Sequence, residues 1–130
     1  MRGSVKPILV VDDDASIRGL ICEILDTEGY ETHAVANGRD TVTAARELQP
    51  ALIIMDLRMP VMDGVTAIRM LRADPGTAGI PIIALSAGFT LLTQARTLPI
   101  EGIMPKPFEL DALIALVRRS LTVDTVVAPE

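Results

Sequence analysis

The sequence has no tryptophan, one cysteine and one histidine, and aromatic residues make up only 2% of its 130 residues. A single cysteine excludes a small disulfide-stapled scaffold, which carries an even set of cysteines. So few rings exclude the aromatic stacking platforms with which proteins bind single-stranded nucleic acid. No apolar run approaches the roughly 18 residues that span a bilayer, and the N-terminus lacks the regions of a secretory signal. We therefore expect a cytoplasmic protein that does not contact membranes.

Basic residues are also in the minority, with 12 Lys and Arg against 17 Asp and Glu, which gives a formal net charge of −5. A deficit of positive charge argues against direct binding to nucleic acid, because phosphate contacts need clustered Lys and Arg. Hydrophobic residues nevertheless make up 49% of the chain, enough for a packed core. The length predicts one domain, over residues 6–121, with flexible termini at 1–5 and 122–130.

Short aliphatic runs alternate with stripes of helical spacing along the chain. The runs predict strands over 8–11, 31–36, 52–55, 81–85 and 103–104. The stripes predict helices over 17–25, 41–48, 65–71, 91–98 and 110–121. Five strands alternating with five helices predict an α/β sandwich around a parallel sheet, with helices on both faces.

Polar and charged residues directly follow four of the five predicted strands: Asp12, Asp13 and Asp14, then Asp56, Ser86 and Lys106. Ligands of open parallel sheets bind beyond the carboxyl ends of the strands, so these side chains are expected to share one acidic pocket. Carboxylates held so close together repel one another unless a cation neutralises them. Oxygen ligands alone favour a hard divalent ion, Mg²⁺ or Mn²⁺.

The same residues lie in motifs that resemble the receiver domain of two-component response regulators. These motifs are Val11-Asp12-Asp13, Met55-Asp56-Leu57-Arg58-Met59-Pro60 with Met62-Asp63-Gly64, Leu85-Ser86-Ala87, and Lys106-Pro107-Phe108. The resemblance runs from about Lys6 to Leu121, nearly the whole chain, with the motifs in order at the strand ends. It implies a flavodoxin-like, doubly wound (βα)5 fold with the sheet order 2-1-3-4-5.

The resemblance also implies roles for individual residues. Asp56 would accept a phosphoryl group from a histidine kinase or a histidine phosphotransfer protein. Asp13, Asp56 and the backbone carbonyl of Arg58 would hold Mg²⁺, with Asp12 acting through water. Positioning and charge compensation are what phosphoryl transfer needs most, and such a set supplies both.

Two further roles follow from the same resemblance. Ser86 would donate a hydrogen bond to the bound phosphoryl oxygens, and Lys106 would neutralise them. The Lys106–Pro107 peptide bond is expected to be cis. Phosphorylation would then switch contacts with a downstream protein, since a phosphoryl group adds up to about two negative charges.

Other polar and sulfur-containing residues have simpler interpretations. Asp14 precedes a predicted helix and is expected to cap it. Cys22 is expected to be a small structural hydrophobe, and His33 a surface residue rather than a phosphodonor. Met59 and Met62 are assigned to packing or to the rim of the pocket.

One departure from the family concerns the switch. Most receivers carry Tyr or Phe three residues before the conserved lysine, where this chain has Ile103. Coupling from Ser86 to the outer surface is therefore expected to differ. The stretch between Ser86 and Lys106 is apolar and lacks acidic residues, so we expect a face for a protein partner or a second copy of the chain. The residues assigned to this face are Phe89, Leu91, Leu92, Leu98 and Ile103.

Two alternatives stay open from the sequence. A metal-dependent phosphohydrolase of the haloacid-dehalogenase type has its nucleophile after the first strand, where Asp12-Asp13-Asp14 lies, but would leave the Asp56 motif unexplained. The chain is also compatible with a receiver excised from a larger hybrid kinase or regulator. The leading interpretation is a stand-alone receiver that acts as a phosphorylation switch and not as an enzyme on other substrates.

Overall fold

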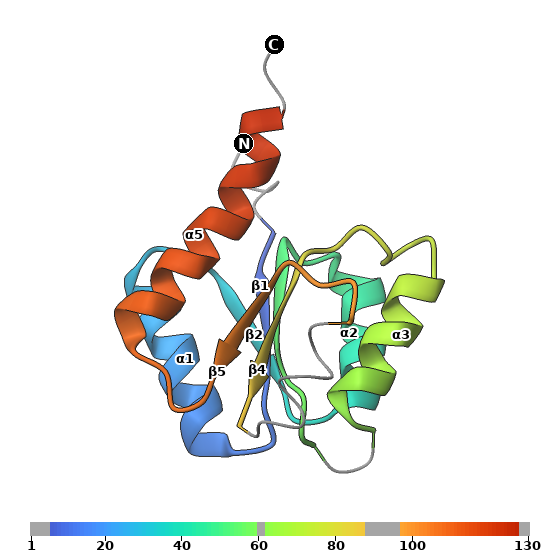
Figure 1. Cartoon of the computed structure of the whole chain (residues 1–130), viewed down its shortest axis with the longest axis horizontal. Helices are drawn as coiled ribbons and strands as arrows, with labels where there is room; N and C mark the ends of the chain where they lie inside the picture. Colours follow the sequence, from blue (N-terminus) through green and yellow to red (C-terminus); the bar gives the residue numbers. More distant parts are fainter. Residues whose placement is uncertain (1–5, 60–61, 88–96, 128–130) are drawn as a thin grey trace.

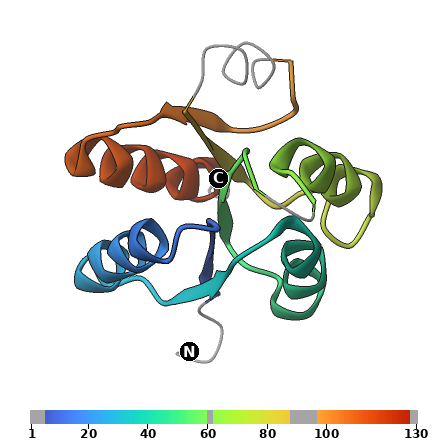
Figure 2. The same cartoon turned by 90° about the horizontal axis from the view of Figure 1, so that it is seen from below.

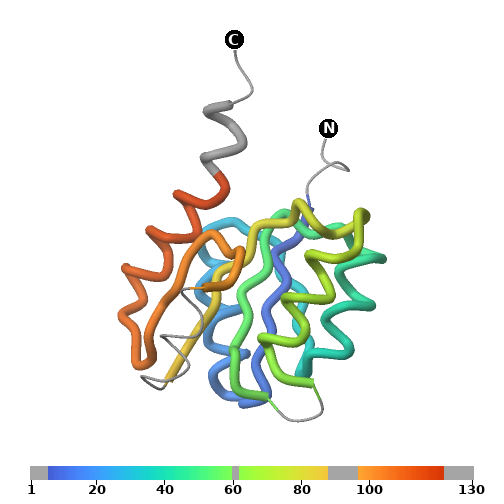
Figure 3. The backbone as a smooth tube through the Cα atoms, turned by 45° about the vertical axis from the view of Figure 1, so that its right-hand side comes forward, coloured from blue at the N-terminus to red at the C-terminus, as the bar shows by residue number. Residues whose placement is uncertain are grey.

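The computed structural model describes residues 6–59, 62–87 and 97–127, and its centre is a five-stranded parallel sheet. The strands are β1 Ile8–Val11, β2 Thr32–Val35, β3 Leu52–Asp56, β4 Ile82–Ser86 and β5 Gly102–Pro105. Their order in the sheet is β2-β1-β3-β4-β5, which confirms the predicted topology. The strands lie side by side in the backbone trace of Figure 3.

Four helices are described: α1 Ala15–Thr27, α2 Gly38–Leu48, α3 Gly64–Ala73 and α5 Leu110–Val127. Helices α1 and α5 cover one face of the sheet, and α2 and α3 cover the other (Figures 1 and 2). The helix predicted over 91–98 falls almost entirely outside the described residues. Among the described residues, no helix is long and apolar enough to cross a membrane.

The last helix differs from its prediction, because α5 continues to Val127 where an end at Leu121 was expected. No glycine or proline lies between these two positions, and the first proline is Pro129. Nothing in the local sequence therefore stops the helix earlier.

Short polar side chains define where the other helices begin. The carboxylate of Asp14 accepts hydrogen bonds from the backbone N–H groups of Ser16 and Ile17 at the start of α1, as predicted. Asn37 caps α2, and Asp63 caps α3 through the N–H of Thr66. These caps place the starts of the helices next to the carboxyl ends of β1, β2 and β3.

The core has two layers, one on each face of the sheet. All residues of β1, β3 and β4 are buried, as expected of parallel strands covered on both faces. Leu9, Ile53 and Met55 pack with α2 and α3, whereas Ile8, Ile54 and Leu85 pack with α1 and α5. The edge strands β2 and β5 contain no fully buried residue. The fully buried centre of the sheet therefore carries the two strand ends that bear carboxylates, at β1 and β3.

Candidate functional site

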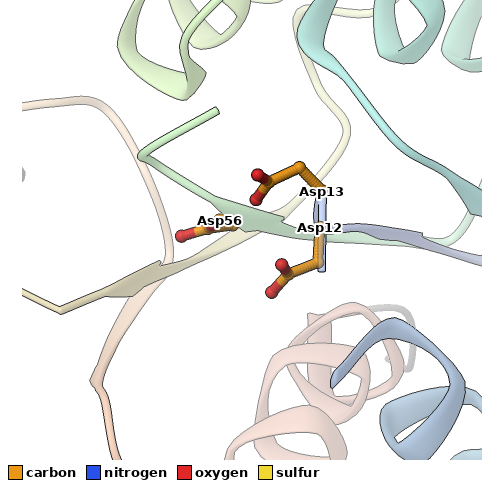
Figure 4. Close-up of side chains that lie close together, drawn as sticks. All are labelled: Asp12, Asp13 and Asp56. Atoms are coloured by element: carbon orange, nitrogen blue, oxygen red, sulfur yellow. The ribbon is translucent and has the colours of Figure 1, made fainter. Parts of the chain in front are cut away.

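Three carboxylates meet at the carboxyl end of the sheet (Figure 4). Asp12 directly follows β1 and Asp56 ends β3, and these neighbouring strands pair with Val11 opposite Met55. One carboxylate oxygen each of Asp12, Asp13 and Asp56 lies within 4.8 Å of the others. Asp12 and Asp56 are only 1% and 5% exposed, whereas Asp13 is open to solvent. Strand ends thus hold two carboxylates inside the protein and one at its surface.

Lys106 brings a positive charge to the same place from the edge of the sheet. It follows β5, and its backbone N–H donates to the carbonyl of Ser86 at 2.7 Å. Its Nζ lies 3.0 Å from Asp12 Oδ2 and 3.5 Å from Asp56 Oδ1. The Lys106–Pro107 peptide bond is cis, as predicted. The ammonium therefore bridges the two buried carboxylates.

The charges in this cluster change the proton affinities of its members. Burial raises the pKa of Asp56, and the negative charge of Asp12 raises it further, against the opposing effect of Lys106. Burial alone would lower the pKa of Lys106, but its hydrogen bond to Asp12 and the charge of Asp56 outweigh burial and raise it. Lys106 is therefore a firmly charged ammonium, while the Asp56 carboxylate lacks full charge compensation.

Backbone contacts fix the loops that carry the carboxylates. Asp12 Oδ1 accepts from the N–H of Asp14 at 3.0 Å, and Asp56 Oδ1 accepts from the N–H of Arg58 at 3.4 Å. Arg18, in the second turn of α1, donates from Nη1 to the carbonyl of Asp12 at 2.7 Å. Sequence reasoning missed Arg18, although a side chain on a helix leans toward the N-terminus and so toward this loop.

Gly64 brings the start of α3 against the end of β3. Its N–H donates to the carbonyl of Leu57 at 3.0 Å. A Cβ at Gly64 would lie 2.7 Å from both the carbonyl oxygen of Asp56 and the Cα of Leu57. Only glycine leaves room for this approach, so the residue shapes the loop after Asp56.

A cavity of about 300 Å³ opens over the carboxylates. It is lined by Asp12, Asp13, Asp14, Ile17, Asp56, Arg58, Met59, Ala87 and Lys106. Of the predicted site residues that the structure describes, Ser86 is outside this lining: it is 2% exposed, at the end of β4, next to Ala87. Met62 also lies away from the cavity and packs against the core. The structure thus brings the acids, Arg58 and Lys106 to one opening, with Ser86 directly behind it.

The predicted partner face is only partly described. Phe89, Leu91 and Leu92 lie outside the described residues. Leu98 is 8% exposed and belongs to the core layer under α2 and α3, so its assignment to an exposed face was wrong. Ile103 is half-buried and packs against the same layer. Among the described members of the face, neither offers a fully exposed apolar side chain.

The two remaining residues with candidate chemistry lie apart from the cavity lining. His33 is exposed on the edge strand β2, in agreement with its assignment to the surface. Cys22 is half-buried on α1 and packs against the core layer under α1 and α5, as expected of a structural residue.

A family model described as the response regulator receiver domain matches residues 8–118. The chain belongs to the response regulator receiver family. This receiver is also similar to the DNA-binding response regulator MtrA of Mycobacterium tuberculosis, with 39% identity over 116 residues. That match covers 88% of this chain and 50% of MtrA, so the receiver spans about half the length of this relative.

Solved structures of receivers agree with the fold. The chemotaxis response regulator CheY4 of Vibrio cholerae has a TM-score of 0.82 and 28% identity, with 91% of this chain and 100% of that chain covered. The receiver domain of the sensor histidine kinase PA1611 from Pseudomonas aeruginosa has a TM-score of 0.81 and 31% identity, with 91% and 98% covered. The latter structure holds a magnesium ion in its active site cleft.

Proposed function

We propose that this receiver accepts a phosphoryl group on the carboxylate of Asp56 from the phosphohistidine of a histidine kinase or histidine phosphotransfer protein. An Asp56 oxygen forms the new bond to phosphorus as the nitrogen–phosphorus bond breaks, and the histidine nitrogen leaves with the electron pair. The observation that carries the proposal is the position of Asp56, beside two further carboxylates and 3.5 Å from the ammonium of Lys106. The phosphorylated form then changes contacts with other proteins.

The donor set fits a hard divalent cation. Asp12, Asp13 and Asp56 offer oxygen atoms within 4.8 Å of one another, and Arg58 lines the same cavity. Asp13, Asp56 and the backbone carbonyl of Arg58 would hold Mg²⁺, or Mn²⁺, with Asp12 acting through water. When bound, the ion would neutralise charge on the phosphoryl oxygens and help to orient the donor.

The remaining residues supply charge compensation and orientation. Lys106 is positioned to move from its carboxylate partners to the oxygens of the new phosphoryl group, because its Nζ already lies beside Asp56. Ser86 lies on the strand next to that of Asp56, where Asp56 pairs with Leu85. Its hydroxyl would donate to a phosphoryl oxygen and so link the modification to β4.

The test is labelling of the purified chain by a small phosphodonor, acetyl phosphate or phosphoramidate, with and without Mg²⁺. We expect labelling that requires the metal and disappears in Asp56→Asn. Asp63→Asn is the matched control, because it makes the same charge change in the same loop and asparagine still caps α3. Undiminished labelling of the Asp56 variant would refute the assignment. An acyl phosphate mapped to Asp12, or turnover of small phosphate esters, would favour a phosphohydrolase instead.

A further inference from the structure

The side chain of Arg72 makes four hydrogen bonds outside the cavity that Asp12, Asp13 and Asp56 line. Arg72 lies in the last turn of α3, and its side chain is only 15% exposed. Its guanidinium donates four hydrogen bonds: from Nε to Pro99 O at 2.8 Å, from Nη1 to Ala78 O at 2.8 Å and to Ile80 O at 2.7 Å, and from Nη2 to Glu101 Oε1 at 3.1 Å. One side chain therefore ties α3 and the segment before β4 to the segment before β5.

Glu101 converts this contact into a restraint on strand pairing. Its N–H donates to the carbonyl of Ile82 at 2.9 Å, and its Oε1 accepts from the N–H of Ile82 at 2.6 Å. The carboxylate thus extends the ladder between β4 and β5 beyond the pair of Ile83 and Gly102. Because Arg72 holds the same oxygen, the start of β5 is fixed relative to both β4 and α3.

Besides these contacts, β5 is held by its ladder to β4 and by the half-buried Ile103 and Met104, which pack against the two core layers. It is an edge strand of four residues, pairs only with β4, and has no fully buried residue. Its far end leads into Lys106, whose N–H donates to Ser86 O and whose Nζ contacts Asp12. Figure 1 shows that β5 runs from the end of the sheet where α3 finishes to the end where α1 begins. The short strand therefore connects the Arg72 contacts to the phosphorylation site.

We propose that Arg72 is a positioning residue for Lys106. It holds Glu101, Glu101 sets the register and tilt of β5, and β5 places the Lys106 ammonium beside Asp12 and Asp56. A weakly buried strand is prone to slip, and a slip of one residue would turn every side chain to the opposite face. The catalytic consequence rests on the proposed function, whereas the positioning itself does not.

The direct test is hydrogen exchange of single backbone amides in the metal-free protein. The amides to follow are those of Glu101 and Lys106, which donate to β4 at the two ends of β5. In Arg72→Ala we expect both to exchange at least about tenfold faster, because hydrogen bonds from a charged donor are lost. The amide of Ile53, near the start of β3, donates to the carbonyl of Pro81 and reports the change in global stability. Its change in exchange free energy is subtracted from the changes at Glu101 and Lys106.

Thr77→Ala is the matched control for local destabilisation. The buried Thr77 hydroxyl donates to Leu71 O at 2.7 Å, so its loss weakens the same α3–β4 segment without removing a contact to Glu101. We expect the Lys106 amide to keep its wild-type exchange rate, relative to Ile53, in this variant. Equal acceleration in both variants would overturn the proposal, as would an Arg72→Ala effect confined to Glu101.

A milder variant keeps the test decisive if Arg72→Ala does not fold. In Arg72→Lys the charge is retained, but an ammonium cannot span the carbonyls and the carboxylate that the guanidinium fork reaches. We expect the Lys106 amide of this variant to exchange faster than in the wild type, but more slowly than in a protein whose β5 no longer pairs with β4. Wild-type exchange at this amide in Arg72→Lys would contradict the role of the guanidinium.

Labelling kinetics separate this proposal from the proposed function. With acetyl phosphate and Mg²⁺, we expect Arg72→Ala to label about tenfold or more slowly, since small displacements of catalytic groups have large effects on rate, and Thr77→Ala to label at the wild-type rate. Failure of the wild-type chain to label would refute the proposed function, and the exchange data would still decide whether Arg72 positions Lys106. Normal labelling of Arg72→Ala beside a labelled wild type would overturn the catalytic consequence.

Discussion

Lys106 and Asp12, 94 positions apart in the chain, form an ion pair with 3.0 Å between Nζ and Oδ2. The pair joins the end of edge strand β5 to the end of β1 in the centre of the sheet. Together with Asp13 and Asp56, these groups amount to three carboxylates and one ammonium, a formal charge of −2. A divalent cation would balance that charge, so the proposed metal ion and the proposed phosphoryl group are compatible with one small pocket.

Replacing Lys106 by methionine is expected to destabilise the metal-free protein by about 1–3 kcal/mol. The substitution leaves Asp12, which is 1% exposed, without its charged partner. Urea unfolding measures the loss, and added Mg²⁺ should restore part of it by replacing the positive charge. Arg118→Met, which breaks an exposed pair with Glu28, should cost less than about 1 kcal/mol. A smaller loss for Lys106→Met than for Arg118→Met would contradict this account.

Asp56→Asn is expected to stabilise the metal-free protein at neutral pH. The folded-state pKa of Asp56 is raised from 3.8, first by burial and then by the charge of Asp12. Ionisation of a carboxyl group with a raised pKa destabilises the folded state. The free energy of unfolding that Asp56 contributes therefore falls as pH rises from 3.8 through the folded pKa. Asparagine removes that cost, and we expect the Tm at pH 7 to rise by about 3–5 °C, as roughly 1 kcal/mol does in a domain of this size.

The gain from Asp56→Asn should shrink in melts at pH 3.5, because the penalty of ionising the buried carboxyl develops only as pH rises above 3.8 and through the raised folded pKa. Asp13→Asn makes the same charge change at an exposed position of the same pocket, and should move the Tm much less. A gain of equal size at both pH values, or an equal gain for Asp13→Asn, would show that burial of Asp56 is not the cause.

The central strands could be predicted from the sequence because parallel strands buried on both faces are continuous aliphatic runs. The run 52–55 became β3 with one residue added, Asp56, and the run 81–85 became β4, shifted by one residue to end at Ser86. Hydrogen bonding to the next strand continues past the last apolar side chain, so a polar residue can complete a strand. The edge strands were less exactly predicted, since only their inner sides pair with the sheet.

The acidic site could also be predicted, because strand ends in a parallel sheet gather at one edge and the candidate residues lie at or just after the ends of apolar runs. The contacts of Arg18 and Arg72 could not be predicted from the sequence. Each depends on a long side chain reaching a backbone carbonyl of another segment, and such a contact has no characteristic spacing in the sequence. Leu98 was misassigned for a related reason: it lies in the short turn before β5, and the sequence of such a turn does not show which of its side chains reach the core.

Cys22 is expected to react slowly with an aromatic disulfide reagent. Burial is the main cause that raises the pKa of its thiol above 9.0, so the reactive thiolate is scarce at pH 8. We expect the folded protein to react about tenfold or more slowly than the protein unfolded in urea. The chain has a single cysteine, so the absorbance of the released thiolate reports this residue alone. Equal rates in the folded and unfolded protein would contradict the half-buried position on α1.

Gly64→Ala is expected to damage the site by moving backbone rather than by removing a functional group. The new Cβ would lie 2.7 Å from the carbonyl oxygen of Asp56, and this neighbour is backbone at the end of a central strand. Relief of the clash must therefore displace either the start of α3 or the loop after Asp56. We expect a loss of about 1–3 kcal/mol in urea unfolding, together with weaker Mg²⁺ binding, because the loop carries Arg58.

The matched control is Gly19→Ala, in the middle of α1, where no atom lies within 4 Å of the added Cβ. This glycine is exposed, so alanine should stabilise the helix by about 0.5–1 kcal/mol and leave Mg²⁺ binding unchanged. The same chemical change is thus expected to have opposite signs at the two positions. Destabilisation by Gly64→Ala without any change in Mg²⁺ affinity would show that α3 moves and the loop does not, which would separate the packing of this helix from the geometry of the site.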